Sequence, residues 1–349
     1  MNNNSFFSTE ILRWFRENGR DLPWRETRDP YAIWLSEIIL QQTRIAQGWE
    51  YWERFMQTYP KVEDLAAASE DDVLKLWQGL GYYSRARNLH TAAKQIVALG
   101  AFPNTLEGIK SLKGVGDYTA AAIGSFAFDI PAAVVDGNVY RVLSRYFGID
   151  TPINSTQGKK EFAALAQSLL PASDAASYNQ GMMDFGAIQC TPQSPKCLLC
   201  PLAETCEALR CGRVEELPVK NKTVKVKTRH LSYIYIRCKS SAADGIGKSE
   251  PMVAIHRRGE GDIWQGLWEP YNVSDVKELP SFVKNPILLA KDVKHVLTHR
   301  ILLADFYLLE TESRPPLPDD YIWIRESEIE DYGVPRLIEI MLEKINPAE

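Results

Sequence analysis

Four of the six cysteines of this 349-residue chain fall within one short, proline-punctuated tract, Cys190-x6-Cys197-x2-Cys200-x5-Cys206. The chain starts without the basic segment and apolar core of a secretory leader, so we expect a reducing compartment and no disulfides. Thiols crowded in this way are an oxidation hazard unless they bind a cofactor. Four cysteines can hold a zinc ion or a [4Fe–4S] cluster. Only Cys197 and Cys200 form a CxxC pair, where a zinc ribbon would have two, so the spacing favours an iron–sulfur cluster. Four unligated cysteines are the remaining alternative.

The length and charge of the chain limit how it can be organised. Its 349 residues exceed the length that a single hydrophobic core usually stabilises, which predicts two domains. The composition is that of a globular protein, and no apolar run approaches the length of a membrane span. Residues 1–229 carry 26 Lys/Arg against 25 Asp/Glu, whereas residues 230–349 carry 14 against 20, which together give the net charge of −5. A polyanion would therefore prefer the first part, although the preference from charge alone is weak.

The hydrophobic periodicity changes from helical to strand-like near residue 220. Helices are predicted over residues 8–18, 31–58, 70–76, 85–99, 118–128, 139–147 and 159–170. Strands are predicted over residues 231–236 and 301–308, and a proline-rich loop over residues 314–318. Residues 219–229 join the two parts, and their five Lys/Arg either contact phosphates or are merely solvated. The pattern predicts an all-α domain, a linker and an α+β domain.

A glycine-containing turn lies in the helical part, where Leu112–Ile123 reads Leu-Lys-Gly-Val-Gly-Asp-Tyr-Thr-Ala-Ala-Ala-Ile. Gly114 and Gly116 allow a tight turn that brings backbone N–H groups to a helix N-terminus, where a phosphate can bind. A dinucleotide-binding turn does not fit, because no strand pattern precedes the glycines and Thr119 stands in place of the third glycine. A helix–hairpin–helix that grips the DNA backbone fits better, with an ordinary tight turn as the alternative.

Two carboxylates are candidates for acid–base chemistry. Asp136 follows an apolar run and is by default the N-cap of the next helix. Another helix is predicted to start after Asp29, and on it Glu37 shares a face with apolar residues at spacings of three and four. A carboxyl group on such a face is desolvated, which raises its pKa and makes it a candidate proton donor near neutral pH. The alternative is a buried Glu37 paired with an arginine such as Arg25 or Arg44.

Together, the cysteine spacing, the Leu112–Ile123 hairpin and the segment Val135–Val139 resemble the helix–hairpin–helix Gly/Pro-Asp DNA glycosylase superfamily, iron–sulfur branch. Four further motifs narrow the resemblance to the MutY family of adenine DNA glycosylases: Leu22–Arg25, Trp34–Glu37, Leu40–Thr43 and Gly79–Arg85. The resemblance covers essentially the whole chain and implies a multi-domain protein. An all-α glycosylase domain would span residues 1–215, with a six-helix part near 23–130 and an iron–sulfur part near 1–22 and 131–215. A linker (216–229) and an α+β Nudix-like domain (230–349) would follow.

The resemblance implies a monofunctional glycosylase that hydrolyses the N-glycosidic bond of an adenine flipped out of DNA. Glu37 would be the general acid that protonates adenine at N7. Asp136 would stabilise the oxocarbenium ion, oriented by Tyr118 and Asn138. Endonuclease III has a lysine nucleophile at the place of Tyr118, so strand-cleaving lyase activity is expected to be weak or absent. A bifunctional lyase and a non-catalytic iron–sulfur DNA-binding protein are the alternatives.

The resemblance also assigns contacts with DNA. Arg25 would contact the adenine, and Gln42 and Tyr83 would insert into the base stack on the other strand. The further adenine or DNA contacts would be Trp24, Leu40, Thr43, Gly114 and Gly116.

The C-terminal part resembles the family's Nudix-like domain, which recognises 8-oxoguanine opposite the adenine. Ile263–Pro270 matches its Gly-Leu-Trp-Glu motif, whereas the sequence after Gly266 lacks the Arg-Glu-x-x-Glu-Glu run that holds magnesium in Nudix hydrolases. Nucleotide pyrophosphatase activity is therefore not expected. Leu297-Thr298-His299 matches the family's Phe-Ser-His loop, so Thr298 and His299 would read the lesion without the aromatic contact.

The implied cofactor is a [4Fe–4S] cluster held by Cys190, Cys197, Cys200 and Cys206, in a structural role that presents nearby basic residues such as Lys196 to phosphates. The implied partner is double-stranded DNA with A:8-oxoG or A:G mispairs. We expect a monomer without a membrane partner, in the bacterial cytoplasm and associated with the nucleoid through DNA.

Overall fold

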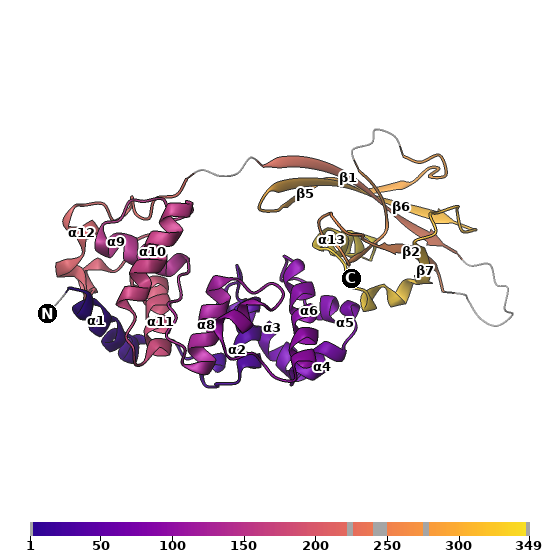
Figure 1. Cartoon of the computed structure of the whole chain (residues 1–349). Helices are drawn as coiled ribbons and strands as arrows, with labels where there is room; N and C mark the ends of the chain where they lie inside the picture. Colours follow the sequence, from indigo (N-terminus) through magenta and orange to yellow (C-terminus); the bar gives the residue numbers. More distant parts are fainter. Residues whose placement is uncertain (1–2, 222–225, 240–249, 275–278, 347–349) are drawn as a thin grey trace. The chain divides into compact units, whose positions relative to one another are not determined.

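The computed structural model describes residues 3–221, 226–239, 250–274 and 279–346 (Figure 1). Its residues group into two compact units, residues 1–66 with 91–222 and residues 67–90 with 223–349. The segment 67–90, which the resemblance placed in the glycosylase domain, thus groups with the C-terminal residues. The predicted domain boundaries stay a prediction, and residues 222–225 of the predicted linker lie outside the described residues.

The first unit is helical. Its α-helices are α1 (Asn3–Asn18), α2 (Pro30–Ile39), α3 (Ile45–Thr58), α4 (Val62–Ala67), α7 (Leu106–Lys110), α8 (Asp117–Phe128), α9 (Gly137–Phe147), α10 (Thr156–Leu169), α11 (Ala175–Asp184) and α12 (Glu207–Arg210). Short 3₁₀-helices cover Pro23–Arg25, Cys197–Leu199 and Ala203–Thr205, and a π-helix, η2, covers Phe185–Gln189. In the part of the chain that the structure describes, no helix is both long and apolar enough to cross a membrane.

Two apolar clusters hold this unit together. In one, α1 packs on α11, and Phe7, Ile11, Phe162 and Phe185 are almost fully buried among α1, α9, α10 and the π-helix. In the other, α2 packs on α8, whose small residues Ala121 and Ala122 are buried. Burial of this apolar surface is the main stabilising term. It also fixes α2, α8 and α9, which carry the candidate catalytic residues.

The prediction of one helix over residues 31–58 is wrong, because the chain forms two helices, α2 and α3, separated by residues 40–44. Gln42 there has a left-handed backbone conformation with φ of 56°, which ends regular helix. Gly48 in α3 lies against Leu40, since a Cβ atom at Gly48 would be 2.6 Å from Leu40 Cδ2. The other six predicted helices are confirmed; α1 starts five residues earlier than predicted, and the remaining ends differ by at most three residues.

The second unit combines the α5–α6 hairpin with a mixed sheet. Helix α5 (Glu70–Leu76) lies in residues 67–90, and α6 (Ser84–Leu99) starts there. The strands are β1 (Lys227–Cys238), β2 (Met252–Arg257), β3 (Trp268–Glu269), β4 (Tyr271–Ser274), β5 (Ile287–Val296), β6 (Arg300–Thr311) and β7 (Tyr321–Arg325). A 3₁₀-helix (Glu326–Asp331) and α13 (Arg336–Ile345) follow.

Within the described residues the strand order is β3-β2-β1-β6-β5, with β4 also on β1 and β7 on β2. Strands β1 and β6 are parallel, from Lys227 opposite Arg300 to Cys238 opposite Thr311, and the other pairs are antiparallel. Along β1, Tyr233 and Tyr235 point to the cluster that contains α13, whereas Ile234 and Ile236 point to the opposite face. This alternation buries β1 on both faces. The strands predicted at 231–236 and 301–308, and the loop at 314–318, are confirmed.

Candidate active site and iron–sulfur loop

Glu37 lies on α2 within a run of buried residues, and it is 7% exposed. Its Oε2 accepts a hydrogen bond from the Tyr118 hydroxyl at 3.0 Å. Burial is the main cause that raises the pKa of Glu37 to about 7; the Tyr118 hydrogen bond and the Arg25 charge lower it, and the charge of Asp136 raises it. The local pattern predicted this desolvation, because apolar neighbours on one helix face exclude water. At neutral pH the side chain can therefore either donate or accept a proton.

Asp136 is the N-cap of α9, as predicted. Its Oδ1 accepts hydrogen bonds from the backbone N–H groups of Asn138 (2.8 Å) and Val139 (2.7 Å), and its Oδ2 accepts one from Asn138 Nδ2 (2.8 Å). Burial raises the pKa of Asp136, and these three hydrogen bonds oppose the rise. The helix N-terminus also favours the ionised form. The carboxylate is thus held in one orientation next to the π-helix.

Tyr118 lies close to both carboxyl groups. Its hydroxyl donates to Glu37, and burial, followed by the charges of Glu37 and Asp136, raises its pKa well above the usual range. Both carboxylates act on one tyrosine, so all three groups belong to one site. The Asn138 side chain donates directly to Asp136, whereas the Tyr118 hydroxyl donates to Glu37.

Arg141 continues the hydrogen-bond chain away from Asp136, and the sequence interpretation missed it. Its Nη2 donates to Asn138 Oδ1 (2.8 Å) and to the Gly186 carbonyl (2.6 Å), and its Nε donates to the Cys190 carbonyl (2.8 Å). The backbone of the first clustered cysteine is therefore hydrogen-bonded, through two side chains, to Asp136. An arginine at i+3 from Asn138 is the signal that the sequence contained.

Arg25 ends a 3₁₀ turn and forms a two-bond ion pair with Asp184 at the end of α11, both N···O distances being 2.8 Å. Asp184 is fully buried and also pairs with Arg20. Burial opposes ionisation of Asp184, but the hydrogen bonds from Arg25 and Arg20 outweigh it and lower its pKa. Because Asp184 lies 159 residues from Arg25, no local pattern could have indicated this partner.

The remaining predicted contacts of the first unit lie at its surface or just under it. Trp24 is buried with its ring edge-on to Trp49 and Trp52. In the turn between α2 and α3, Gln42 is exposed, and Leu40 and Thr43 are partly exposed.

The predicted hairpin is a turn between α7 and α8. Gly114 has a φ of 79°, and Gly116 is the N-cap of α8, with no atom within 4 Å of a Cβ placed there. Both glycines are exposed, whereas Leu112 and Val115 are buried and anchor the turn. The phosphate contact of this turn stays a prediction; the exposed glycines lie at the N-terminus of α8, where a phosphate can bind.

In the second unit, Tyr83 is 7% exposed and its hydroxyl accepts from the Gly79 N–H. Insertion of Tyr83 into DNA would therefore require this side chain to leave its buried position. Its neighbour Tyr82 is 47% exposed and has a left-handed backbone with φ of 47°. The insertion of Tyr83 stays a prediction, and Tyr82 is the more exposed of the two tyrosines in the free protein.

Thr298 and His299 lie exposed in the turn between β5 and β6, which the Leu297 N–H closes on the Arg300 carbonyl at 2.8 Å. The Thr298 hydroxyl is hydrogen-bonded to the Tyr82 hydroxyl. The predicted lesion-reading loop is thus joined to the exposed tyrosine of the α5–α6 hairpin.

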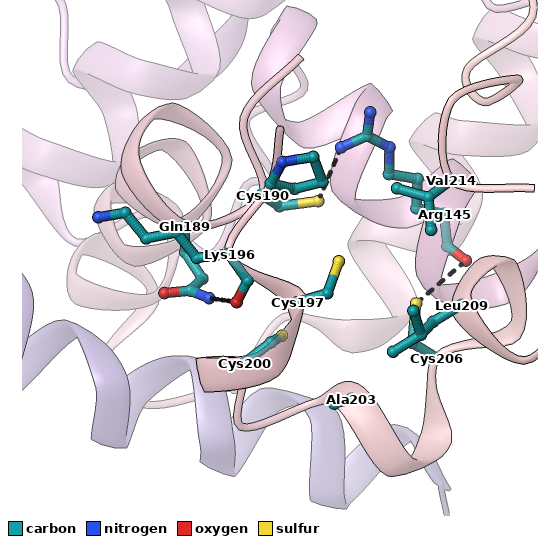
Figure 2. A pocket seen from close by; sticks show the side chains of 11 residues that line it. Arg145, Gln189, Cys190, Lys196, Cys197, Cys200, Ala203, Cys206, Leu209 and Val214 are labelled. Atoms are coloured by element: carbon teal, nitrogen blue, oxygen red, sulfur yellow. Dashed lines mark hydrogen bonds between the residues drawn. The ribbon is translucent and has the colours of Figure 1, made fainter. Parts of the chain in front are cut away.

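The four clustered cysteines line one pocket of the first unit (Figure 2). Arg145 reaches this pocket, where its Nη1 donates to Cys190 Sγ at 3.4 Å and its carbonyl accepts from Cys206 Sγ at 3.6 Å. Burial raises the pKa of Cys200 to about 12 and also raises those of Cys197 and Cys206, so ionised thiols there require a positive partner. Among the described residues, no three His, Cys, Asp or Glu side chains are gathered closely enough to hold a single metal ion. The four-thiol donor set around one pocket fits an iron–sulfur cluster.

Comparisons with known proteins identify the parts of the chain. Residues 35–171 match the HhH-GPD superfamily of base excision DNA repair proteins, residues 190–206 the iron-sulfur binding domain of endonuclease III, and residues 246–344 the NUDIX domain. The predicted [4Fe–4S] cofactor is thereby confirmed, with the four cysteines as the residues that would hold it.

The chain is also similar to whole proteins. It is 30% identical to the adenine DNA glycosylase of Buchnera aphidicola subsp. Schizaphis graminum over 97% of this chain and 98% of that protein. It is 43% identical to the adenine DNA glycosylase of Mus musculus over 61% of this chain, but spans only 44% of that longer protein.

Solved structures resemble the helical part. The structure of a thermostable thymine-DNA glycosylase is 34% identical, with a TM-score of 0.56 over 60% of this chain and 97% of that chain. A trapped endonuclease III–DNA covalent intermediate is 23% identical, with a TM-score of 0.53 over 61% of this chain and 99% of that chain, and so supports the fold alone. The chain belongs to the adenine DNA glycosylases, the MutY family, and is a base-excision-repair DNA glycosylase with an iron–sulfur domain and a C-terminal Nudix-like domain.

Proposed function

We propose that this glycosylase hydrolyses the N-glycosidic bond of adenine mispaired with 8-oxoguanine or guanine in double-stranded DNA, without cutting the strand. The observation that carries the proposal is the pair of buried carboxyl groups with different environments. Glu37 is desolvated and has a pKa of about 7, whereas Asp136 accepts three hydrogen bonds that favour its ionised form. Two carboxyl groups whose environments separate their protonation states are typical of an acid and a charge stabiliser.

Protonated Glu37 donates its proton to N7 of an adenine that has been flipped out of the duplex. The bond between the sugar C1′ and adenine N9 then breaks, and its electron pair leaves with the base. Ionised Asp136 stabilises the resulting oxocarbenium ion. Glu37, now a carboxylate, takes a proton from a water molecule whose oxygen forms the new bond to C1′, which restores the acid.

The absence of strand cleavage follows from the residue at the hairpin helix. Tyr118 has no amine to attack C1′, and its hydroxyl is engaged with Glu37. Schiff-base chemistry needs a lysine at such a place. The site therefore supports hydrolysis that leaves an intact strand with an abasic sugar.

Contacts with the mispair come from both units. Arg25, held by Asp184, would contact the adenine, and Trp24, Leu40, Thr43, Gly114 and Gly116 would make the further adenine and backbone contacts. Gln42 and Tyr82 would insert into the stack, and Thr298 and His299 would read the 8-oxoguanine. The protein would act as a monomer on DNA in the bacterial cytoplasm.

Single-turnover cleavage of duplexes containing A:8-oxoG, A:G or A:T pairs tests this proposal. We expect the wild-type enzyme to remove adenine from the first two, with strand breaks only after alkali. Glu37→Gln should lose at least about a hundredfold in rate, the usual worth of a general acid, whereas Glu63→Gln, an exposed change on α4, should act like wild type. Breaks without alkali would contradict the monofunctional mechanism, and equal cleavage of A:T would contradict the mispair specificity.

A further inference from the structure

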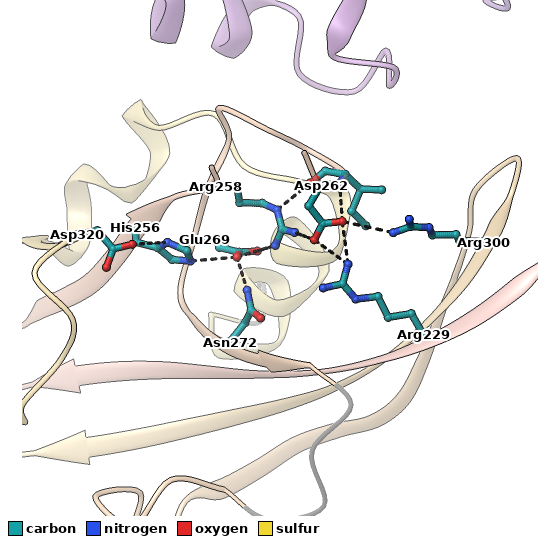
Figure 3. Close-up of polar contacts among 9 residues, drawn as sticks. Arg229, His256, Arg258, Asp262, Glu269, Asn272, Arg300 and Asp320 are labelled. Carbon is teal, nitrogen blue, oxygen red and sulfur yellow. Dashed lines mark hydrogen bonds and ion pairs between the residues drawn. The ribbon is translucent and has the colours of Figure 1, made fainter. Parts of the chain in front are cut away.

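A network of arginine and carboxylate side chains lies next to the β5–β6 turn of the Nudix-like domain and includes Arg300, which follows the turn (Figure 3). None of the reaction steps above uses this network. Its centre is Asp262, in the loop between β2 and β3. The carboxylate accepts hydrogen bonds from three arginines of different segments, Arg229 of β1, Arg258 after β2, and Arg300, the first residue of β6. One acidic group thus joins three segments that are far apart in the sequence.

The three arginines are held to different degrees. Arg229 Nη1 contacts both Asp262 oxygens, at 2.7 and 2.8 Å, and Arg258 Nη2 contacts Oδ2 at 2.7 Å. Arg258 is 8% exposed and also pairs with the buried Glu269. Arg300 has a longer contact, 3.3 Å from Nη1 to Oδ1. The guanidinium groups of these three arginines therefore lie around only two carboxylates, those of Asp262 and Glu269. Neutralising Asp262 would leave the positive charges of the arginines close together without its compensating negative charge.

Arg300 connects this network to the turn. Its carbonyl accepts from the Leu297 N–H, and the Lys227 N–H donates to the His299 carbonyl at 3.2 Å. Lys227 and Arg300 form the first pair of the parallel β1–β6 ladder, and the end of a ladder is where a sheet opens most readily. The side-chain link from Arg300 to Asp262 is therefore placed to hold the turn.

We propose that Asp262 is a positioning residue for recognition of the opposite base: through Arg300 and Arg229 it fixes the turn that carries Thr298 and His299. The specificity part of this inference rests on the proposed function. The fixing of the turn does not, since it concerns the free protein.

Hydrogen exchange of the free full-length protein, measured on peptides spanning residues 296–302, tests the positioning. We expect Asp262→Asn to speed exchange there at least about tenfold, a shift of about 1.4 kcal/mol in the opening equilibrium. Arg300→Gln should do the same while leaving Asp262 paired with Arg229 and Arg258. Asp262→Glu should restore slow exchange. Asp320→Asn is the matched control, because Asp320 lies at the far end of the same network, beside His256. Unchanged exchange in Asp262→Asn and Arg300→Gln would overturn the inference.

The specificity part is measured as the ratio of single-turnover rates on A:8-oxoG and A:G duplexes at subsaturating enzyme. Asp262→Asn should lower this ratio about tenfold, or about 1.4 kcal/mol of discrimination, with the rate on A:G little changed. An equal loss on both duplexes would overturn the inference, because it would indicate general destabilisation. A wild-type ratio of one would instead contradict the proposed specificity, and the exchange measurement would still decide the positioning.

Discussion

Burial raises the pKa of Glu37 to about 7, and the hydrogen bond from Tyr118 opposes this rise. A bond donated to the carboxylate stabilises its ionised form, so Tyr118→Phe should raise the pKa of Glu37 further. The rate of adenine release should fall as pH rises through about 7 in the wild type, because the protonated form is the acid. In Tyr118→Phe the midpoint of this fall should move to higher pH.

The measurement is the single-turnover rate as a function of pH, with Tyr140→Phe as the control for loss of a hydroxyl elsewhere in the first unit. A midpoint that stays in place, or moves to lower pH, would contradict the assigned hydrogen bond.

The same burial costs stability. The pKa of Glu37 is raised from 4.5 when unfolded to about 7 when folded, so the folded state binds the extra proton between these values. Stability therefore falls as pH rises from 4.5 to 7 and stays reduced above it. Glu37→Gln should remove a penalty of about 3 kcal/mol at pH 8.5 and only about 1 kcal/mol at pH 5.5.

Urea unfolding of both proteins at the two pH values measures this difference, with Glu63→Gln as the exposed control. An equal effect at both pH values would show that the gain does not come from ionisation. If Glu37→Gln is inactive but more stable than the wild type, the same carboxyl group both serves catalysis and lowers the free energy of unfolding.

Which site residues the sequence could predict depends on the range of the interaction. Desolvation of Glu37 and capping by Asp136 follow from neighbours two to four positions away, so the local pattern indicated both. The partner of Arg25, Asp184, is brought in by the tertiary fold, and no short-range pattern marks it. The choice between Tyr82 and Tyr83 depends on which side of a loop packs inward, which neither residue type decides.

At the scale of elements, the sequence predicted helices best where capping and periodicity agree. The helix over residues 70–76 has its predicted bounds, and in the structure Ser69 caps it and acidic residues fill its first turn. The break at residues 40–44 was missed, since it is imposed by the left-handed backbone at Gln42 and by close packing of α3, and no proline or glycine lies within residues 40–44. Short strands such as β2 and β7 were also missed, because their pairing in the sheet, and not their own pattern, defines them.

The orientation of the Asp136 carboxylate depends on the packing of the π-helix η2 against α9. A Cβ atom at Gly186 would lie 2.6 Å from Asn138 Cβ and 2.9 Å from its carbonyl oxygen. Gly186→Ala must therefore push the first turn of α9 away, at a cost of about 1–3 kcal/mol. Because Asn138 orients Asp136, the glycosylase rate should fall by tenfold or more.

Thermal unfolding and single-turnover rates of Gly186→Ala measure the two effects. Gly259→Ala is the control, since nothing lies within 4 Å of its added methyl group. A variant with normal rate and stability would show that η2 and α9 separate without cost, contrary to the packing described here.

At the scale of the whole molecule, residues 67–90 group with the C-terminal residues although they precede them by more than a hundred positions. Arg257 of β2 pairs with Glu70 (2.8 Å) and Asp71 (3.0 Å), and Arg87 donates to the Gln265 carbonyl at 2.6 Å. Most of these charges are partly exposed, so each pair contributes little alone. Together with the packing of Gly266 near Leu74, they make the α5–α6 hairpin dependent on the Nudix-like domain.

A chain ending at residue 221 should therefore lose protection in one place. Hydrogen exchange should become faster within residues 67–90 and stay unchanged within residues 118–147, which pack in the first unit. Equal protection of residues 67–90 with and without the C-terminal residues would contradict the grouping. Because the hairpin carries Tyr82 and the domain carries Thr298, loss of the domain would disturb both the residue that we propose for insertion and the turn that we propose for lesion reading. Truncation should thus weaken DNA insertion and lesion reading together, while the Glu37 and Asp136 geometry in the first unit persists.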